Sequence, residues 1–408
     1  MAIKVVLLTQ WFDPEPTFKG LAFARELVGK GFEVEVVTGF PNYPGGKVYD
    51  GYRMRLLQRE VIDGVQITRL PLYPSHDGSA LRRIGNYVSF AASSLFYGLF
   101  MLKRPDVIYA YHPPLTVGMT ASLLRLIRRI PVVYDIQDMW PDTLRATGML
   151  GNERLLSAIS RFCDWVYRRV DRIVVLSPGF RRLLIERGVP PEKLDVIYNW
   201  CDEAALQAAP VASPDSAPDG QFRVVFAGNM GKAQALSAVV EAAELLSTER
   251  AEVRFVLVGS GIEVDSLKQL VAKKRLENVV FVPRVPMNEV GAILASADAL
   301  LVHLKDDPLF AITIPSKTQA YMAIGKPLLM AVRGDAAELV QQAACGVTAI
   351  PEDARSVADA VIRLANLAAL EREEMGERSR VFYQRELSLA VGAERFAAHF
   401  RALAGRTP

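Results

Sequence analysis

The hydrophobic positions of this chain form short apolar runs, and stretches with helical periodicity separate most of them. In the first half the runs are rich in Val and Ile, and a helix is expected over 21–29. The predicted strands are 3–9, 33–38, 65–70, 107–111, 132–136 and 172–176. Strands that are apolar at nearly every position are typical of a parallel sheet with helices on both faces. The pattern therefore predicts a doubly wound α/β domain.

The same alternation restarts after a segment of different composition. Residues 207–221 are rich in Ala, Pro, Ser and Asp, which is typical of a linker. Beyond the linker, the predicted strands are 222–228, 253–259, 278–282, 299–304, 326–331 and 346–350. The sequence therefore predicts two Rossmann-like domains, 1–205 and 221–385, and a final helical segment, 386–408.

Ligands of doubly wound sheets bind at the carboxyl ends of the strands, so functional residues are expected on strand-exit loops facing an interdomain cleft. The most informative loop follows the strand 222–228, where two glycines allow a tight turn and a helix is expected from Ala233. Backbone N–H groups, a helix start and a lysine together suit a diphosphate. The residues expected to bind it are Gly228, Asn229, Met230, Gly231 and Lys232.

Three further strand-exit loops in the second half carry candidate ligand-binding residues. Gly259 ends the strand 253–259 and permits close approach of a ligand. Arg284 follows the strand 278–282, within reach of a base or a phosphate. Around Pro315 a helix is expected to begin, with Thr313 or Ile314 near its cap and with Ser316 and Lys317 in its first turn. This first turn is a second candidate anion site, expected on the side opposite Lys232.

The strand exits of the first half carry further candidate residues. The loop 10–20 leads into a helix at Gly20, whose start is a candidate site for a phosphate or for a second substrate, and Lys19 stands beside that helix start. His112 follows the strand 107–111, where an imidazole can carry a proton or donate a hydrogen bond. Asp138 and Trp140 follow the strand 132–136 and are suited to hydrogen bonding with a sugar and stacking on it. Each of these side chains also has an ordinary structural interpretation, as a helix cap or a core residue.

Charge and cysteine content narrow the possible partners. The net charge of +3 argues against a nucleic-acid partner, but residues 1–200 carry 26 Lys and Arg against 19 Asp and Glu. A basic first half suits an anionic partner, such as a lipid phosphate or an acidic leaflet. The chain has three widely spaced cysteines and an N-terminus that is typical of a buried strand. These features predict a reducing, cytoplasmic location.

Residues 84–102 form a charge-free and mostly apolar run, with two arginines before it and a lysine and an arginine after it. The run reaches the length of a membrane span, but it contains Asn, Ser and Gly, and basic residues at both ends give no orientation. A buried domain helix is the favoured interpretation. A helix lying on the membrane and a true span are the alternatives.

Several reaction types lack their motifs in this sequence. No GxxxxGK[ST] phosphate loop, no Asp-x-Asp pair on a loop, no His and Cys cluster with metal-ligand spacing and no GxSxG elbow occurs. We therefore expect no metal ion, and we expect Lys, Arg and helix dipoles to stabilise a leaving phosphate.

The order of motifs resembles a known family. AGNMGKAQAL, LVGSG, IPSKTQAYMAIGKP and GDAAELV resemble the family 4 retaining glycosyltransferases. YDIQDMWPD and VLSPGFRRLLIERGVPPEKLDVIYNWCD resemble its bacterial O-antigen and capsule subgroup, including N-acetyl-fucosamine transferases. The resemblance covers nearly the whole chain and implies a GT-B fold, α/β with two doubly wound domains and a cleft. It implies that the first domain binds the acceptor, that the second binds the nucleotide-sugar, and that the last helix crosses back.

The resemblance also implies roles for single residues. Asn229 and Lys232 fall in the loop that holds the donor diphosphate, and His112 falls where a histidine approaches the reacting sugar. The Arg and Lys that are usual in the diphosphate loop appear here as Asn229 and Gln234. The family's two glutamates, eight positions apart, correspond to residues 312 and 320, which are Ile and Ala. Lys317 is expected to compensate.

The function that the resemblance implies is retaining transfer of a sugar, N-acetylated deoxyhexoses being candidates, from a UDP-sugar to a lipid-linked saccharide. UDP-sugar would be a substrate, with no cofactor, and the protein would work peripherally at the inner membrane in O-antigen or other lipopolysaccharide synthesis. Two alternatives remain open. A non-hydrolysing UDP-sugar epimerase has the same two-domain layout, and the missing glutamates suggest a non-catalytic sugar-nucleotide-binding subunit.

Overall fold

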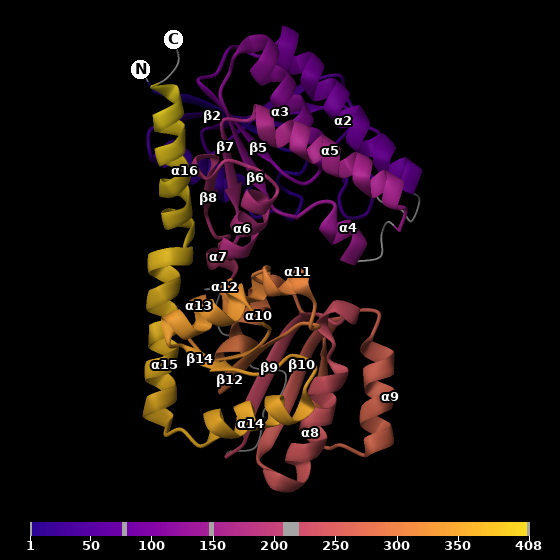
Figure 1. Cartoon of the computed structure of the whole chain (residues 1–408), viewed down its shortest axis with the longest axis vertical. Helices are drawn as coiled ribbons and strands as arrows, with labels where there is room; N and C mark the ends of the chain where they lie inside the picture. Colours follow the sequence, from indigo (N-terminus) through magenta and orange to yellow (C-terminus); the bar gives the residue numbers. More distant parts are fainter. Residues whose placement is uncertain (1, 76–79, 147–150, 207–219, 406–408) are drawn as a thin grey trace. The chain divides into compact units, whose positions relative to one another are not determined.

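The computed structural model describes residues 2–75, 80–146, 151–206 and 220–405, which form two compact units (Figure 1). The first unit comprises Met1–Tyr198 and Leu389–Pro408, and the second comprises Asn199–Ser388. The predicted linker, 207–221, lies outside the described residues except for its last two positions.

The first unit is built on an eight-stranded sheet with the order β3-β4-β2-β1-β5-β6-β7-β8. All neighbours pair in parallel except β3 and β4, which are antiparallel. The strands are β1 Lys4–Leu8, β2 Glu33–Gly39, β3 Gln58–Ile62, β4 Val65–Leu70, β5 Val107–Tyr111, β6 Val132–Ile136, β7 Arg172–Val175 and β8 Leu194–Val196. The sequence pattern predicted six of these strands and missed the two at the edges, β3 and β8.

Helices cover both faces of this sheet, because neighbouring residues of a strand point to opposite sides. In β5, Ile108 lines a small internal space together with Tyr97 of α2. The next residue, Tyr109, contacts Phe23 of α1 and Phe396 of α16 through its ring. The helices of this unit are α1 Leu21–Gly29, α2 Ala80–Phe100, α3 Leu115–Arg128, α4 Asp142–Ala146, α5 Glu153–Arg169, α6 Pro178–Glu186, a 3-10 turn Pro191–Lys193 and α16 Leu389–Ala404.

Helix α2 contains most of the apolar run 84–102 and lies beside α3 (Figure 1). Its inner side chains, Phe90 and Tyr97, are buried, and buried Asn86 donates a hydrogen bond to the carbonyl of Tyr73 at 2.7 Å. No helix among the described residues is both long enough and apolar enough to span a bilayer.

The second unit is built on a six-stranded parallel sheet with the order β11-β10-β9-β12-β13-β14. The strands are β9 Phe222–Asn229, β10 Val253–Ser260, β11 Val279–Pro283, β12 Ala299–His303, β13 Leu328–Ala331 and β14 Gly346–Thr348. The helices are α7 Glu203–Leu206, α8 Ser237–Glu249, α9 Val264–Lys274, α10 Met287–Ala295, α11 Pro308–Ala311, α12 Ser316–Ile324, α13 Asp335–Ala343, α14 Ala354–Ala365, α15 Ala369–Phe382 and a π-helical turn Tyr383–Leu387. All six strands of this half were predicted.

The strand order reverses at one point in each sheet, next to β1 in the first unit and next to β9 in the second. At such a switch point the neighbouring loops leave in opposite directions, which opens a crevice at the carboxyl ends of the strands. The candidate residues after β1, β5 and β9 therefore lie at the switch points.

Two helix starts differ from the sequence prediction. The helix expected from Ala233 begins only at Ser237, because a 3-10 turn, Lys232–Gln234, and a left-handed Ala235 precede it. Pro315 is the N-cap of α12 and not its first helical residue, so Ser316 begins the helix. Lys317 still lies in the first turn of α12.

Candidate functional site

The loops that leave β9 and β10 are hydrogen-bonded to each other. The N–H of Met230 donates to the carbonyl of Ser260 at 2.8 Å, and the N–H of Glu263 donates to the carbonyl of Met230 at 3.0 Å. A Cβ at Gly259 would overlap the carbonyl of Gly228, and its φ of 140° also disfavours other residues. Gly259 therefore keeps the two strand exits in contact.

The backbone donors of this loop are partly used inside it. The N–H of Gly231 donates to Oε1 of Gln234 at 3.0 Å, and the N–H of Met230 is bonded to Ser260. This differs from the expectation that the N–H groups after Gly228 face a ligand. The side chain of Met230 is buried in the core, whereas Gly228 and Asn229 are exposed. Side-chain cations are consequently the main candidates for holding an anion here.

Helix α12 brings Lys317 to the end of β9. Its Nζ lies 3.6 Å from the centroid of the Phe226 ring, and 3.4 Å from where a Cβ of Gly228 would stand. The ammonium is buried and has no hydrogen-bond partner among the described residues. Burial lowers the pKa of Lys317 to about 7. A buried amine without an acceptor is costly, so a site of this kind is suited to an anion that enters beside Gly228.

One turn further along α12, Tyr321 fixes the helix against the same strand. Its hydroxyl accepts a hydrogen bond from the N–H of Ala227 at 2.7 Å and donates to the carbonyl of Ala227 at 3.2 Å. Residues four positions apart lie on one face of a helix, so Tyr321 also holds Lys317 over the end of β9. The two candidate anion sites of the second half thus share the Gly228 loop.

The remaining donor-site candidates are more peripheral. Lys232 is exposed at the start of the 3-10 turn, Arg284 is exposed after β11, and Ser316 is exposed at the start of α12. The hydroxyl of Thr313 donates to the carbonyl of Leu309 at 2.7 Å, which satisfies it locally. Lys232 and Arg284 remain available to a ligand that lies outside the loop.

His303, at the end of β12, holds the turn that carries Lys232. His303 is not among the residues predicted from the sequence. Its Nδ1 lies 2.7 Å from the carbonyl of Gln234, and its Nε2 lies 3.2 Å from the N–H of Glu352. A carbonyl accepts and an N–H donates, so Nδ1 carries the proton and the ring is neutral. Its only signal in the sequence was one polar residue within an apolar strand.

In the first unit, β5 ends in a buried histidine. The ring centroid of His112 lies 6.0 Å from that of Tyr134 and 5.5 Å from that of Trp140, both in edge-on geometry. Nδ1 of His112 has no hydrogen-bond partner among the described residues, and burial lowers the pKa of His112 to about 3. The imidazole is therefore neutral at ordinary pH, which suits hydrogen bonding better than proton carriage.

Next to it, β6 ends in two carboxylates with different surroundings. Asp135 is buried and accepts hydrogen bonds from the Tyr109 hydroxyl at 2.5 Å and from Nε2 of Gln137 at 2.8 Å. Asp138 is only partly covered, and burial raises its pKa. Of the candidate residues after β6, Asp138 and Trp140 are therefore both partly exposed to solvent.

The structure places Lys19 in the core of the first unit. Its Nζ lies 5.2 Å from the centroid of the Phe396 ring of α16, and the charge of Asp135 acts on it. Burial lowers the pKa of Lys19 to about 8. The helix start at Gly20 is already capped, because the N–H of Leu21 donates to Oδ2 of Asp13 at 2.6 Å. Neither the Lys19 ammonium nor the helix start at Gly20 therefore offers an open site for an anion.

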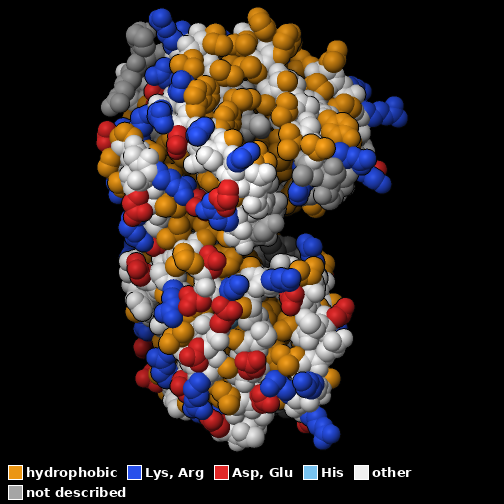
Figure 2. Space-filling view, turned by 45° about the vertical axis from the view of Figure 1, so that its right-hand side comes forward, with side chains coloured by type: hydrophobic (Ala, Val, Ile, Leu, Met, Phe, Trp, Pro, Cys, Tyr) orange, Lys and Arg blue, Asp and Glu red, His pale blue; other side chains and the backbone are white. Residues whose placement is uncertain are grey.

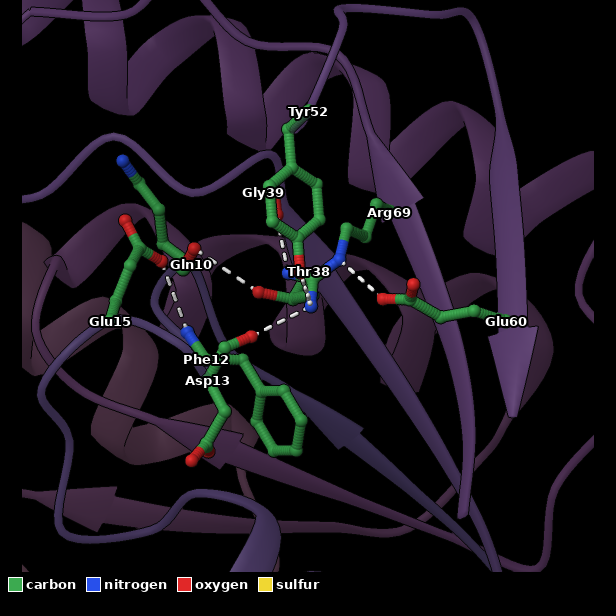
Figure 3. A network of polar contacts seen from close by, with 9 residues as sticks. All are labelled: Gln10, Phe12, Asp13, Glu15, Thr38, Gly39, Tyr52, Glu60 and Arg69. Carbon is green, nitrogen blue, oxygen red and sulfur yellow. Dashed lines mark hydrogen bonds and ion pairs between the residues drawn. The ribbon is translucent and has the colours of Figure 1, made fainter. Parts of the chain in front are cut away.

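A buried polar network holds the loop after β1 (Figure 3). Arg69 of β4 is fully buried and donates to Oε1 of Glu60 at 2.7 Å and to the carbonyl of Asp13 at 2.7 Å. Glu15 accepts hydrogen bonds from the N–H groups of Asn42 and Tyr43, both at 2.7 Å, and burial raises its pKa to about 7. These contacts tie the middle of the loop, at Asp13 and Glu15, to β4 and to the segment that follows β2.

No group of three His, Cys, Asp or Glu side chains is placed to hold a metal ion in the described part of the chain.

Two protein families match adjoining parts of the chain. The glycosyl transferase 4-like domain matches residues 21–200, and the glycosyl transferases group 1 domain matches residues 213–382. The putative colanic acid biosynthesis glycosyl transferase WcaI of Escherichia coli K12 is 29% identical over 338 residues, which are 79% of this chain and 82% of WcaI. The probable glycosyltransferase WbjE of Pseudomonas aeruginosa is 27% identical over 310 residues, 74% and 76% of the two chains.

Solved structures share the fold at low sequence identity. Sucrose-phosphate synthase from Thermosynechococcus elongatus superposes with a TM-score of 0.74 at 16% identity, covering 99% of this chain and all of that chain. HepE of Anabaena, in complex with UDP and glucose, superposes with a TM-score of 0.67 at 16% identity, covering 98% and 100%.

Proposed function

Since this chain belongs to the glycosyltransferases with the GT-B fold, we propose that it transfers a sugar, with retention, from a UDP-sugar to a lipid-linked saccharide at the inner membrane surface. The products would be UDP and a lipid-linked saccharide longer by one sugar, a precursor of a bacterial surface polysaccharide, and N-acetylated deoxyhexoses are candidate donor sugars. The name of WcaI, which refers to colanic acid biosynthesis, and the UDP and glucose bound in the HepE structure support this proposal.

The observation that carries the proposal is the buried amine of Lys317 beside Gly228, at the switch point of the second sheet. A diphosphate in this position would give Lys317 the acceptor that it lacks, and exposed Lys232 would approach the same ligand from the turn after β9. Both cations would stabilise negative charge that grows on the leaving group.

The proposed reaction is a substitution at the anomeric carbon with retention. The acceptor oxygen forms a bond to the anomeric carbon on the face from which the nucleotide departs, while the bond between that carbon and the phosphate oxygen breaks. The proton of the acceptor hydroxyl passes to the departing diphosphate. Neutral His112 would hydrogen-bond to the reacting sugar, and Asp138 and Trp140 would bind the acceptor.

The test is transfer by Lys232→Ala at saturating donor. The expected result is a loss of roughly 10²–10³ in kcat, since removing one transition-state donor costs about 3–4 kcal/mol. Lys273→Ala is the matched control, because Lys273 is an exposed lysine of α9 in the same unit. Transfer near the wild-type rate in Lys232→Ala contradicts this role.

A further inference from the structure

Helix α2 exposes large apolar side chains along the face that points away from the sheet. Five such residues are each between 51% and 81% exposed. Two of them, Phe96 and Phe100, pack against each other with 5.1 Å between their ring centroids. The residues of this outer face are Leu81, Ile84, Val88, Phe96 and Phe100. They recur at intervals of three, four or eight positions, which places them on one side of a helix with 3.6 residues per turn.

The opposite side of α2 is buried, and it includes Ser94 as well as the rings of Phe90 and Tyr97, all at most 3% exposed. Ser94 and Tyr97 line a small internal space together with residues of β5 and α3. On an ordinary surface helix, the side that faces away from the protein carries charged and polar residues. Here the protein covers only one side, and scattered exposed residues do not account for a continuous outer face of large side chains.

The neighbouring helix extends this surface. α3 packs beside α2 and exposes Leu126 and Ile127, at 52% and 61%, close to its end. The guanidinium of Arg128 donates to the carbonyl of Leu102 at 2.9 Å, so the end of α3 is tied to the end of α2. Figure 2 shows hydrophobic side chains gathered over the first unit, with Lys and Arg at their margins.

The charges around the outer face are almost all positive. From residue 80 to residue 134 the sequence has seven basic residues and one acidic residue, Asp106. The basic residues are Arg82, Arg83, Lys103, Arg104, Arg125, Arg128 and Arg129. Those beside α2 stand at its two ends, and the apolar run between them contains no charge. An apolar stripe between basic ends is the pattern of a helix that lies in a membrane interface.

We propose that the outer face docks the protein on an anionic lipid surface, with α2 lying in the plane of the interface. The apolar side chains would enter the boundary between headgroups and acyl chains, and the basic ends would stay among the anionic headgroups. A second copy of the chain is a poorer occupant. In a two-fold interface built on α2, the basic ends of one copy would face those of the other or lie beside them without acidic partners.

The inference deepens the proposed function and rests on it in one respect, because a lipid-linked acceptor would be met at the surface where α2 docks. The surface itself is independent of the donor site. The proposed donor site lies in the second unit and the proposed docking surface on the first, so the two proposals fail separately.

The experiment is co-sedimentation of the full-length protein with vesicles of phosphatidylcholine, with and without phosphatidylglycerol. The test variant is Phe96→Ser with Phe100→Ser, and Leu370→Ser is the matched control, because Leu370 is exposed to 65% in the second unit and lies outside the candidate donor site. A further variant reverses charge at one end of α2, Lys103→Glu with Arg104→Glu. Thermal melting shows that each variant is folded, and UDP-induced stabilisation reports the donor site separately.

The wild type should bind vesicles that contain phosphatidylglycerol, and it should bind less at high salt. The double serine variant should lose roughly tenfold or more in vesicle partitioning, while its stabilisation by UDP stays that of the wild type. The control should bind like the wild type, and the charge-reversal variant should lose its preference for phosphatidylglycerol.

Three outcomes overturn docking. The first is that the wild type fails to bind anionic vesicles, and the second is that the double serine variant binds them as well as the wild type. The third is that the wild type is a dimer in solution whereas the double serine variant is a monomer. If UDP does not raise the melting temperature of the wild type, that result counts against the proposed function but not against docking.

Discussion

Replacing Lys317 by Met should make the protein more stable and less able to bind UDP. Met keeps the length of the side chain and its contact with Phe226, but it removes an amine that is buried without a hydrogen-bond partner among the described residues. The two effects have opposite signs, so a general disturbance of the fold cannot produce both.

The expected gain in stability follows from the pKa of Lys317. Burial lowers this pKa from 10.5 to about 7. At about 1.36 kcal/mol per pKa unit, the buried ammonium costs on the order of 4 kcal/mol near neutral pH. This pKa already includes the contact with the Phe226 ring, which therefore gives no further offset. Lys317→Met should therefore raise the free energy of unfolding by on the order of 4 kcal/mol at about pH 7.

The pH dependence has a definite sign. Between about pH 7 and pH 10.5 the unfolded chain binds a proton at Lys317 that the folded chain does not, so wild-type stability rises with pH through this window. The advantage of Lys317→Met should be complete below about pH 7 and should disappear above about pH 10.5.

The assay is urea unfolding of the full chain near pH 7 and near pH 10, together with calorimetric titration of UDP. The variant should lose roughly a hundredfold or more in UDP affinity, as expected when a buried charge pair loses one partner. Lys273→Met, at an exposed lysine, is the control and should change neither quantity. A variant that is less stable than the wild type near pH 7, or that binds UDP equally well, refutes the reasoning.

Three other consequences follow. Binding of a diphosphate should raise the pKa of Lys317, so UDP affinity of the wild type relative to Lys317→Met should fall as pH rises above about 7, measured by titration across pH. Gly259→Ala should lower stability by about 1–3 kcal/mol in urea unfolding, because its Cβ would overlap the carbonyl of Gly228 at a positive φ. His303→Leu leaves the Gln234 carbonyl without its donor, so KM for the donor should rise several-fold while the melting temperature falls modestly, and an unchanged KM would remove its positioning role.

The strand pattern was predictable wherever a strand is buried on both faces. The runs 107–111 and 132–136 coincide with β5 and β6, because a central parallel strand needs apolar residues at every position. The edge strands of the first unit were missed for the opposite reason. β3, QREVI, carries polar residues, and β8 has only three residues, so both depend on a partner strand that the local pattern does not reveal.

The sequence predicted which loops carry the candidate residues, but not what surrounds these residues in the fold. Glycines and a lysine after a strand identified the Gly228 loop. The burial of Lys317 depends on Phe226, and that of Lys19 depends on Phe396, aromatic residues that lie far away in sequence. His303 and Arg69 were missed because a polar residue within an apolar strand becomes informative only when its partners in space are known.

A crystal structure of the protein with UDP, grown in the presence of a chelator, would test most directly whether cationic side chains hold the diphosphate without a metal ion. We expect the diphosphate at the end of β9, with Nζ of Lys317 turned from the Phe226 ring to within hydrogen-bond distance of a phosphate oxygen and with Lys232 beside it. UDP bound elsewhere while Lys317 remains over the ring, or UDP that binds only when a divalent cation is restored, would contradict the proposal.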